Sequence, residues 1–162
     1  MGEPNINWAQ EQPAPRRAIR MIHANFPQVR NLGIYNGRVI AGTATPSAHA
    51  QGRALDIGLN ANNPAEKTLG DALFHALIRS AARSGIDNII WNRQIWSVQR
   101  GGPRPWVGNY ANGAPRNPHT DHIHVEWTHP GSQLERLNFL ELEISILRSG
   151  FEDLNKSFQR LA

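Results

Sequence analysis

The stretch that decides the fold class is NPAEKTLGDALFHALIRSAARSGIDNIIWNRQIWSV, residues 63–98. Asn63-Pro64 opens a predicted helix that runs to about Ser84 and stops at Gly85. Its apolar residues recur at helical spacing from Leu69 to Ala81. Two β-prone runs follow, Asn88–Trp91 and Gln94–Val98. A helix followed by a short β pair, without a repeating βαβ rhythm, indicates an α+β fold rather than a parallel α/β fold.

The segments on either side supply the other predicted elements. A first helix is predicted over Pro15–Asn25, and a hairpin is predicted over residues 34–40 around an Asn-Gly pair. Ala54–Leu59 and Ile123–Trp127 are predicted strands. Residues 99–118, rich in Gly, Pro, Asn and Arg, are predicted to form a long irregular loop. Together these elements predict a small, mainly antiparallel sheet flanked by helices.

The C-terminal segment has an apolar pattern of its own, which predicts a helical extension. Its apolar residues follow an unbroken heptad spacing: Leu137, Leu140, Ile144, Leu147, Phe151, Leu154, Phe158 and Leu161. Two interpretations stay open, a helix packed on the domain's own sheet or a coiled-coil arm for a partner, a carrier or a second copy. The predicted organisation is therefore a polar arm at 1–13, a main domain at 14–131 and an amphipathic tail at 132–162.

The composition excludes several classes of protein. A length of 162 residues suits one domain, and a hydrophobic share of 40% excludes a wholly disordered chain. The chain has no cysteine, so disulfides and thiolate zinc sites are excluded. The net charge of +4 comes from scattered basic residues, so no nucleic-acid partner is predicted. No apolar stretch reaches the ~18 residues of a membrane span, and the first residues lack the apolar region of a secretory leader.

Histidines are concentrated in one short segment, and their arrangement suits a metal site. Three of the seven histidines fall within residues 119–124, and His49 precedes Asp56 on the way into a predicted strand. A catalytic zinc ion is held by three protein ligands and keeps one open position. His49 and Asp56 could supply two of these ligands, and His124 could supply the third from a facing strand. His122 is two residues before His124, so on a strand it points into the same cavity.

These residues also resemble a known family. The pattern S-x-H-x-x-G-x-A-x-D over residues 47–56, followed by H-x-H at residues 122–124, is similar to that of the LAS-type zinc peptidases. This family includes D-alanyl-D-alanine carboxypeptidases, murein endopeptidases and phage endolysin peptidases, and the resemblance covers roughly residues 40 to 128. It implies a Zn²⁺ ion in the main domain with three ligands: His49, Asp56 and His124.

The resemblance implies two alternatives for the catalytic base. Peptidases of this group use either an acidic residue three positions before the last ligand or an H-x-x-H-x-H arrangement. The sequence has both, because Asp121 lies three positions before His124, and His119 and His122 complete the second pattern. We favour Asp121 as the base, with His122 stabilising the oxyanion and His119 orienting the site. Glu126 is expected to be hydrogen-bonded at the sheet edge instead.

Substrate contacts are predicted at Ser47, Arg53 and Trp106. Arg53 could bind a substrate carboxylate with two hydrogen bonds, or it could pair with Asp87 on the surface. Trp106 could line a groove for an extended peptide beside the long loop. The other two tryptophans near this loop are expected to pack in the core: Trp91 and Trp96.

These observations predict a zinc metallopeptidase that hydrolyses the stem or cross-link peptides of peptidoglycan. A cell-wall substrate requires action in the periplasm or outside the cell, and a phage lysin or a secreted antibacterial effector would act there without a visible leader. Two alternatives are a zinc-containing binding module without turnover and, more remotely, a metal nuclease suggested by the pI of 10.3.

Overall fold

A single antiparallel sheet of six strands carries both the core and the candidate site in the computed structural model, which describes residues 10–29, 32–33, 35–107 and 116–161. The strand order is β1-β2-β6-β3-β4-β5. The strands are β1 (Leu32–Gly33), β2 (Ala54–Gly58), β3 (Ile86–Trp91), β4 (Gln94–Ser97), β5 (Gly101–Pro105) and β6 (His122–Trp127). The helices are α1 (Pro13–Asn25), the short 3-10 helix η1 (His49–Gln51), α2 (Pro64–Ser84), α3 (His129–Ser132) and α4 (Asn138–Leu161). The predicted α+β class is confirmed.

The two faces of the sheet have different chemical character, because side chains alternate along each strand. On one face, Leu55 of β2 lies opposite Val125 of β6, which lies opposite Ile89 of β3, and all three are fully buried. On the other face, Asp56 lies opposite His124. The first face therefore belongs to the hydrophobic core, and the second carries ionisable groups.

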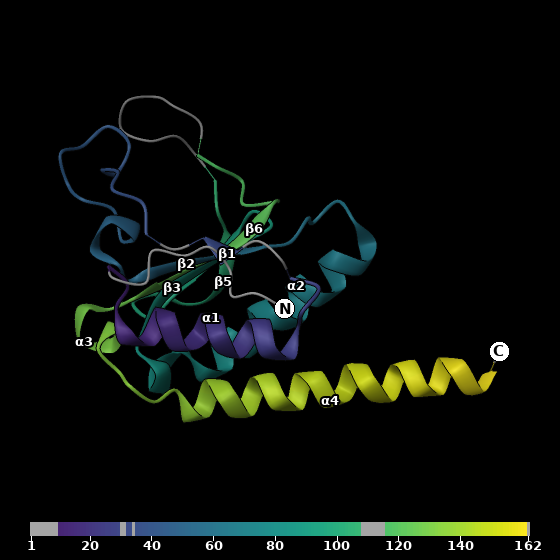
Figure 1. Ribbon diagram of the computed structural model, residues 1–162. Coiled ribbons are helices and arrows are strands. Elements are labelled where there is room, and N and C mark those ends of the chain that lie inside the picture. The colour runs from purple at the N-terminus through teal and green to yellow at the C-terminus, as the bar shows by residue number, and fades with distance from the viewer. Residues whose placement is uncertain (1–9, 30–31, 34, 108–115, 162) are drawn as a thin grey trace.

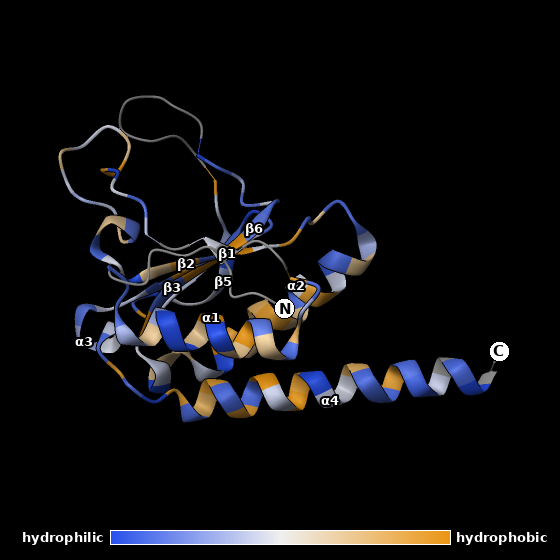
Figure 2. Ribbon diagram, viewed as in Figure 1, coloured by the Kyte–Doolittle hydropathy of each residue, from blue (hydrophilic) through white to orange (hydrophobic). Residues whose placement is uncertain are grey.

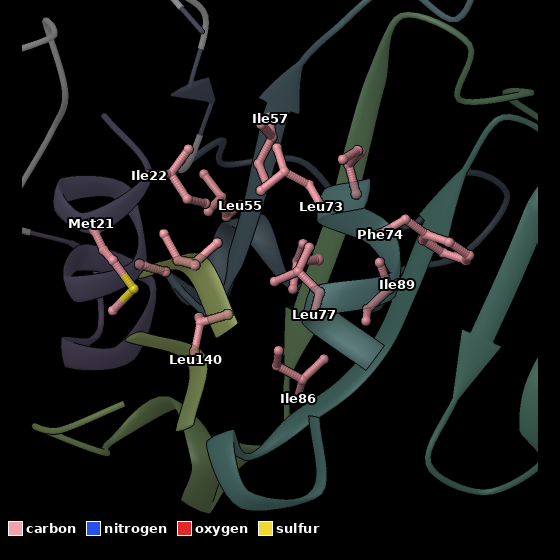
Figure 3. Packing of buried hydrophobic residues seen from close by; sticks show 14 of the residues in the cluster. Met21, Ile22, Leu55, Ile57, Leu73, Phe74, Leu77, Ile86, Ile89 and Leu140 are labelled. Carbon is pink, nitrogen blue, oxygen red and sulfur yellow. The ribbon is translucent and has the colours of Figure 1, made fainter. Parts of the chain in front are cut away.

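Helices α1, α2 and α4 cover the apolar face of the sheet. In Figure 1 these three helices lie together on one side of the strands, while the segment that leads into β2 lies on the other side. Figure 3 shows side chains from α1, α2 and α4 meeting those of β2 and β3. Ile22, Leu73, Leu77 and Leu140 are fully buried in this layer. Burial of apolar side chains on this scale is the main stabilising contribution to such a fold.

The long helix α2 has the boundaries that its sequence predicts. Asn63 caps its first turn, with the side-chain oxygen accepting hydrogen bonds from the backbone N–H groups of Ala65 and Glu66. Gly85 ends the helix in the left-handed conformation, with φ of 67°. Gly70 lets α2 approach β3 closely, because a Cβ at this position would overlap the ring of Trp91.

The C-terminal helix α4 first packs against the domain and then leaves it. Leu137, Leu140 and Ile144 are buried in the core, and Leu147 and Phe151 pack against it. Figure 1 shows α4 continuing beyond the ends of α1 and α2, and Figure 2 shows apolar and polar residues alternating along its whole length. The first half of the heptad pattern therefore joins the domain, but it packs mainly on α2 and α1 and not directly on the sheet as the first interpretation had it. Association with a partner or a second copy through Leu137–Leu161 stays a prediction. The division into an arm at 1–13, a main domain at 14–131 and a tail at 132–162 also stays a prediction.

Two local predictions are wrong. In the described part of residues 34–40 no strand pair forms around Asn36-Gly37; Val39 instead forms an isolated bridge with Pro46. Within the predicted loop at 99–118, residues 101–105 form β5, which pairs with β4 despite its two prolines. Proline is tolerated there because β5 is an edge strand. Residues 108–115 of that loop, residue 34 and the first nine residues of the predicted polar arm lie outside the described residues.

Within the residues that the structure describes, no helix combines the length and the apolar character needed to cross a membrane.

Candidate metal centre

The centre is built on two paired strands and one turn. Asp56 of β2 and His124 of β6 are direct cross-strand partners on the face of the sheet that the helices leave uncovered. His49 enters from η1, a turn stabilised by the Ser47 hydroxyl, which accepts a hydrogen bond from the Ala50 N–H at 3.2 Å. Gly52 ends η1 with φ of 66°, and a Cβ there would overlap the carbonyl oxygen of Gln10. Glycine is therefore required at this position to hold the turn against the segment before α1.

Three predicted ligands converge on one point. The His124 Nδ1 atom lies 2.8 Å from Asp56 Oδ1, and His49 Nε2 lies 3.3 Å from both of these atoms. His49 and His124 are buried, whereas the Asp56 side chain keeps 27% exposure. One donor atom from each residue lies within 4.8 Å of the others. This group of buried histidine and aspartate side chains could hold a metal ion.

His119 lies beside this group in a strained backbone conformation. Its φ of 51° is in the left-handed region, which is uncommon for a residue with a side chain. Asn117 holds it there: its side-chain oxygen accepts a hydrogen bond from the His119 N–H at 2.9 Å, and its carbonyl oxygen lies 2.7 Å from the ring Nδ1. A carbonyl oxygen only accepts hydrogen bonds, so Nδ1 carries the proton and Nε2 keeps a free lone pair. The β3–β4 turn supports this loop, since the Asn92 N–H donates to the His119 carbonyl.

His122 is oriented in the same way by its neighbour. Its Nδ1 atom lies 2.8 Å from Asp121 Oδ1, and its Nε2 atom lies 3.5 Å from Asp56 Oδ1. Because an ionised carboxylate only accepts hydrogen bonds, Nδ1 donates to Asp121, and Nε2 faces Asp56 in the cluster. Asp121 itself is on the outside, with 77% of its side chain exposed. β6 begins at His122, one residue before the predicted start, so Asp121 lies outside the strand and is not forced to alternate with it.

A second metal-compatible group overlaps the first. His119, His122 and His124 also bring one donor atom each within 4.8 Å of the others. His124 belongs to both groups, so the two groups describe one connected cluster rather than two separate sites. His119 and His122, predicted to be catalytic, therefore lie beside the predicted ligands. The role of Asp121 as the base stays a prediction.

Behind His124 lies a carboxylate that the sequence analysis placed wrongly. Glu126 Oε1 lies 3.0 Å from His124 Nε2, on the opposite side of the ring from Asp56. Glu126 is not at a sheet edge, because β6 lies between β2 and β3. Asn88 donates a hydrogen bond to Glu126 Oε2 at 2.9 Å, and the Arg53 guanidinium lies 3.8 Å from the same oxygen. The available signal was the i, i+2 spacing, which places Glu126 and His124 on one face of a strand.

The electrostatics of the cluster follow from these contacts. Burial alone would raise the pKa of Asp56, but hydrogen bonds from His124 and His49 outweigh it and hold this pKa well below its usual range. Burial alone would lower the pKa of His124, yet the hydrogen bonds to Asp56 and Glu126, with their charges, raise it to about 9. Burial, with the charges of His124 and His122, lowers the pKa of His119 to about 4. Without a metal, His124 therefore bridges two carboxylates as a cation, and His119 is neutral.

The donor set fits a small divalent transition metal. Imidazole nitrogens and one carboxylate are ligands that suit Zn²⁺, and three such ligands leave a position open for water or substrate. His49, Asp56 and His124 would hold such an ion, which would supply Lewis-acid chemistry at this point. His119 and His122 would lie beside these ligands. The arrangement can bind a metal ion and can accept protons beside it.

The predicted substrate contacts have other partners in the structure. Ser47 stabilises η1, as described above. Arg53 donates from Nη1 to the Trp127 carbonyl at 2.6 Å and from Nε to Gln51 Oε1 at 2.6 Å, and within the described residues no ion pair joins it to Asp87. Trp106 donates to the Asn117 carbonyl at 2.9 Å, and the Arg116 guanidinium lies over its ring. Their roles in substrate binding stay predictions. Core packing of the other two tryptophans is confirmed: Trp91 and Trp96.

Comparison with known proteins identifies one family. The family described as VldE, C-terminal domain, matches residues 7–123 of the chain. The matched segment contains His49, Asp56, His119 and His122 and ends one residue before His124. No curated protein and no solved structure shows significant similarity to the chain. The description of the matching family does not mention a peptidase, so an activity has to be argued from the site itself.

Proposed function

Because the chain belongs to the VldE C-terminal domain family and has a buried cluster able to hold a metal ion, we propose that it is a zinc metallopeptidase acting on the stem or cross-link peptides of peptidoglycan. The observation that supports this most is the convergence of His49, Asp56 and His124, with two further histidine nitrogens beside them. The substrate class is supported by the sequence motifs that resemble the LAS-type peptidases. A peptidoglycan substrate would place the site of action in the periplasm or outside the cell.

The geometry favours His122 over Asp121 as the group that moves the proton. A metal ion held by His49, Asp56 and His124 would polarise the scissile carbonyl and increase the acidity of water. The Nε2 atom of His122 faces this point and can take a proton from the attacking water, then deliver it to the leaving amine. Asp121 accepts the hydrogen bond of Nδ1 and so stabilises the cationic ring. His119, neutral because it is buried, offers Nε2 as an acceptor for a substrate N–H.

A peptidase and a silent binding module make different use of the same cluster. A binding module needs only the three ligands, whereas a peptidase also needs a proton acceptor aimed at the open position. The orientation of His122 by Asp121 and of His119 by Asn117 supports the peptidase.

Purified sacculi and defined muropeptides provide the test. The zinc-loaded protein is incubated with each substrate, and the products are identified by mass spectrometry. We expect new amine and carboxyl termini at one peptide bond, loss of cleavage with a chelator, and recovery on addition of Zn²⁺. His49→Ala serves as the control variant for the metal site. Zinc binding without cleavage of any muropeptide would favour the binding module, and absence of zinc binding would remove the metal centre itself.

A further inference from the structure

Glu126 occupies a position that connects the segments carrying the proposed ligands. It lies on β6, two residues after His124 and on the same face of the sheet. Its Oε1 atom contacts His124 Nε2 at 3.0 Å, and its Oε2 atom accepts a hydrogen bond from Asn88 of β3 at 2.9 Å. Both carboxylate oxygens therefore have a side-chain partner, and the side chain is only 24% exposed. A carboxylate held by two neighbouring strands has little freedom to move.

Arg53 extends this arrangement to the turn that carries His49. Its guanidinium lies 3.8 Å from Glu126 Oε2. The same side chain donates to the backbone carbonyl of Trp127 and to the side chain of Gln51, the last residue of η1. Arg53 is thus positioned by both the strand and the turn. It supplies positive charge beside Glu126.

The hydrogen bond from His124 to Glu126 determines which ring nitrogen is available for a metal. An ionised carboxylate accepts hydrogen bonds and cannot donate them, so the Nε2 atom of His124 must carry a proton. The other nitrogen, Nδ1, lies 2.8 Å from Asp56 Oδ1 and 3.3 Å from His49 Nε2. Glu126 itself cannot reach that point directly, because the imidazole ring lies between its carboxylate and Asp56.

We propose that Glu126, held by Asn88 and Arg53, is a positioning residue that keeps His124 protonated at Nε2 and presents Nδ1 as the metal-binding nitrogen. The inference rests on the metal-binding part of the proposed function and is independent of the substrate. Carboxylates that accept a hydrogen bond from a ligating histidine typically contribute 10- to 100-fold in metal affinity. A glutamine at this position could donate its amide hydrogens toward Nε2 and so would favour the wrong tautomer.

The test compares zinc affinities, measured by competition with a chromophoric chelator, in the full chain. Glu126→Gln is the main variant, and Asn88→Ala removes the partner of Glu126 without touching His124. Glu143→Gln is the matched control, because Glu143 is 22% exposed and is also paired with an arginine, Arg79, at 2.7 Å. A second readout uses long-range ¹H–¹⁵N spectra of the zinc-loaded protein, which report the protonated nitrogen of each histidine ring.

We expect Glu126→Gln to weaken zinc binding about 10- to 100-fold, Asn88→Ala to weaken it less, and Glu143→Gln to leave it within about twofold. The wild-type spectrum should show His124 bound through Nδ1 and protonated at Nε2, and that protonation should be lost or exchange faster in Glu126→Gln. If Glu126→Gln binds zinc like the wild type, or if the control loses as much, the positioning role is refuted. If the wild type itself binds no zinc, the proposed metal centre is refuted. This outcome differs from one in which the wild type binds zinc and Glu126→Gln binds it equally well, so failure of the metal centre and failure of the positioning role can be distinguished.

Discussion

Substituting Asp121 by asparagine separates the two candidate bases. The Asp121 side chain is 77% exposed and its hydrogen-bond partner within the described residues is His122 Nδ1, at 2.8 Å. Loss of an exposed pair of this kind typically changes the free energy of unfolding by about 1 kcal/mol or less, so the fold should be retained. Asp121 is also outside both metal-compatible groups, so zinc content should be unchanged.

The expected loss of turnover follows from the same contact. Two unit charges 2.8 Å apart attract each other by about 1.5 kcal/mol in a medium as polar as water. This is the stabilisation that an exposed Asp121 can give to a cationic His122, and it corresponds to about tenfold in rate. Removal of a general base costs about 10²–10⁴-fold. We therefore expect Asp121→Asn to lose about tenfold in turnover and His122→Ala to lose at least 10²-fold.

Steady-state cleavage of one muropeptide, followed by mass spectrometry, measures both variants with zinc content checked in parallel. A loss above 10²-fold in Asp121→Asn, with full zinc, would exceed what a screened charge pair can supply. That result would identify Asp121 as the base and refute the assignment to His122. Unchanged turnover in His122→Ala would also refute the assignment of the base to His122.

Three further perturbations test other parts of the structure. His49→Ala, Asp56→Ala and His124→Ala should each lose bound zinc in elemental analysis, and full occupancy in any of them would remove that residue from the ligand set. Deletion of residues 137–162 removes three buried apolar side chains, each of which stabilises the fold by roughly 1.5–3 kcal/mol. We therefore expect the truncated protein to lose cooperative unfolding measured by circular dichroism, whereas a folded truncated protein would support a separate tail. Burial, opposed by the charge of a neighbouring arginine, raises the pKa of Glu11 from 4.5 to about 8. Its protonated form therefore stabilises the fold fully below about pH 4.5, and this contribution, about 5 kcal/mol at most, is lost as the pH rises from 4.5 through 8. Glu11→Gln should flatten chemical unfolding profiles between these pH values, and an unchanged pH dependence would contradict this assignment.

The predictable part of the molecule was the part governed by local rules. Helix α2 has an apolar stripe, an asparagine cap and a terminal glycine, so its bounds agree with the prediction. Strand β6 has alternating residues that could be recognised directly. Strand β5 could not be recognised, because its stability comes from pairing with β4 and not from its glycine- and proline-rich composition. The hairpin signal at Asn36-Gly37 failed for the same reason, since the chain there pairs with Pro46 instead.

The candidate site was predictable only in its residue types. Motif spacing selected His49, Asp56 and His124, and the structure brings their donor atoms together. The i, i+2 spacing places Glu126 on the face of His124, but the sequence could not show that Asn88 holds it there, because this depends on the register of β3 and β6. Nor could it predict the left-handed backbone at His119, which is held by contacts to Asn117 and to the β3–β4 turn.

The alternation along β6 separates the chemistry of the strand from its packing. His122, His124 and Glu126 face the cluster, while Ile123, Val125 and Trp127 fill the core from the same six-residue strand. A substitution at His122, His124 or Glu126 therefore changes the cluster while the three core side chains keep their places. An insertion or deletion of one residue would instead exchange the two sets and bury three ionisable groups. The length of β6 is therefore a stricter requirement of this fold than the identity of its three polar residues.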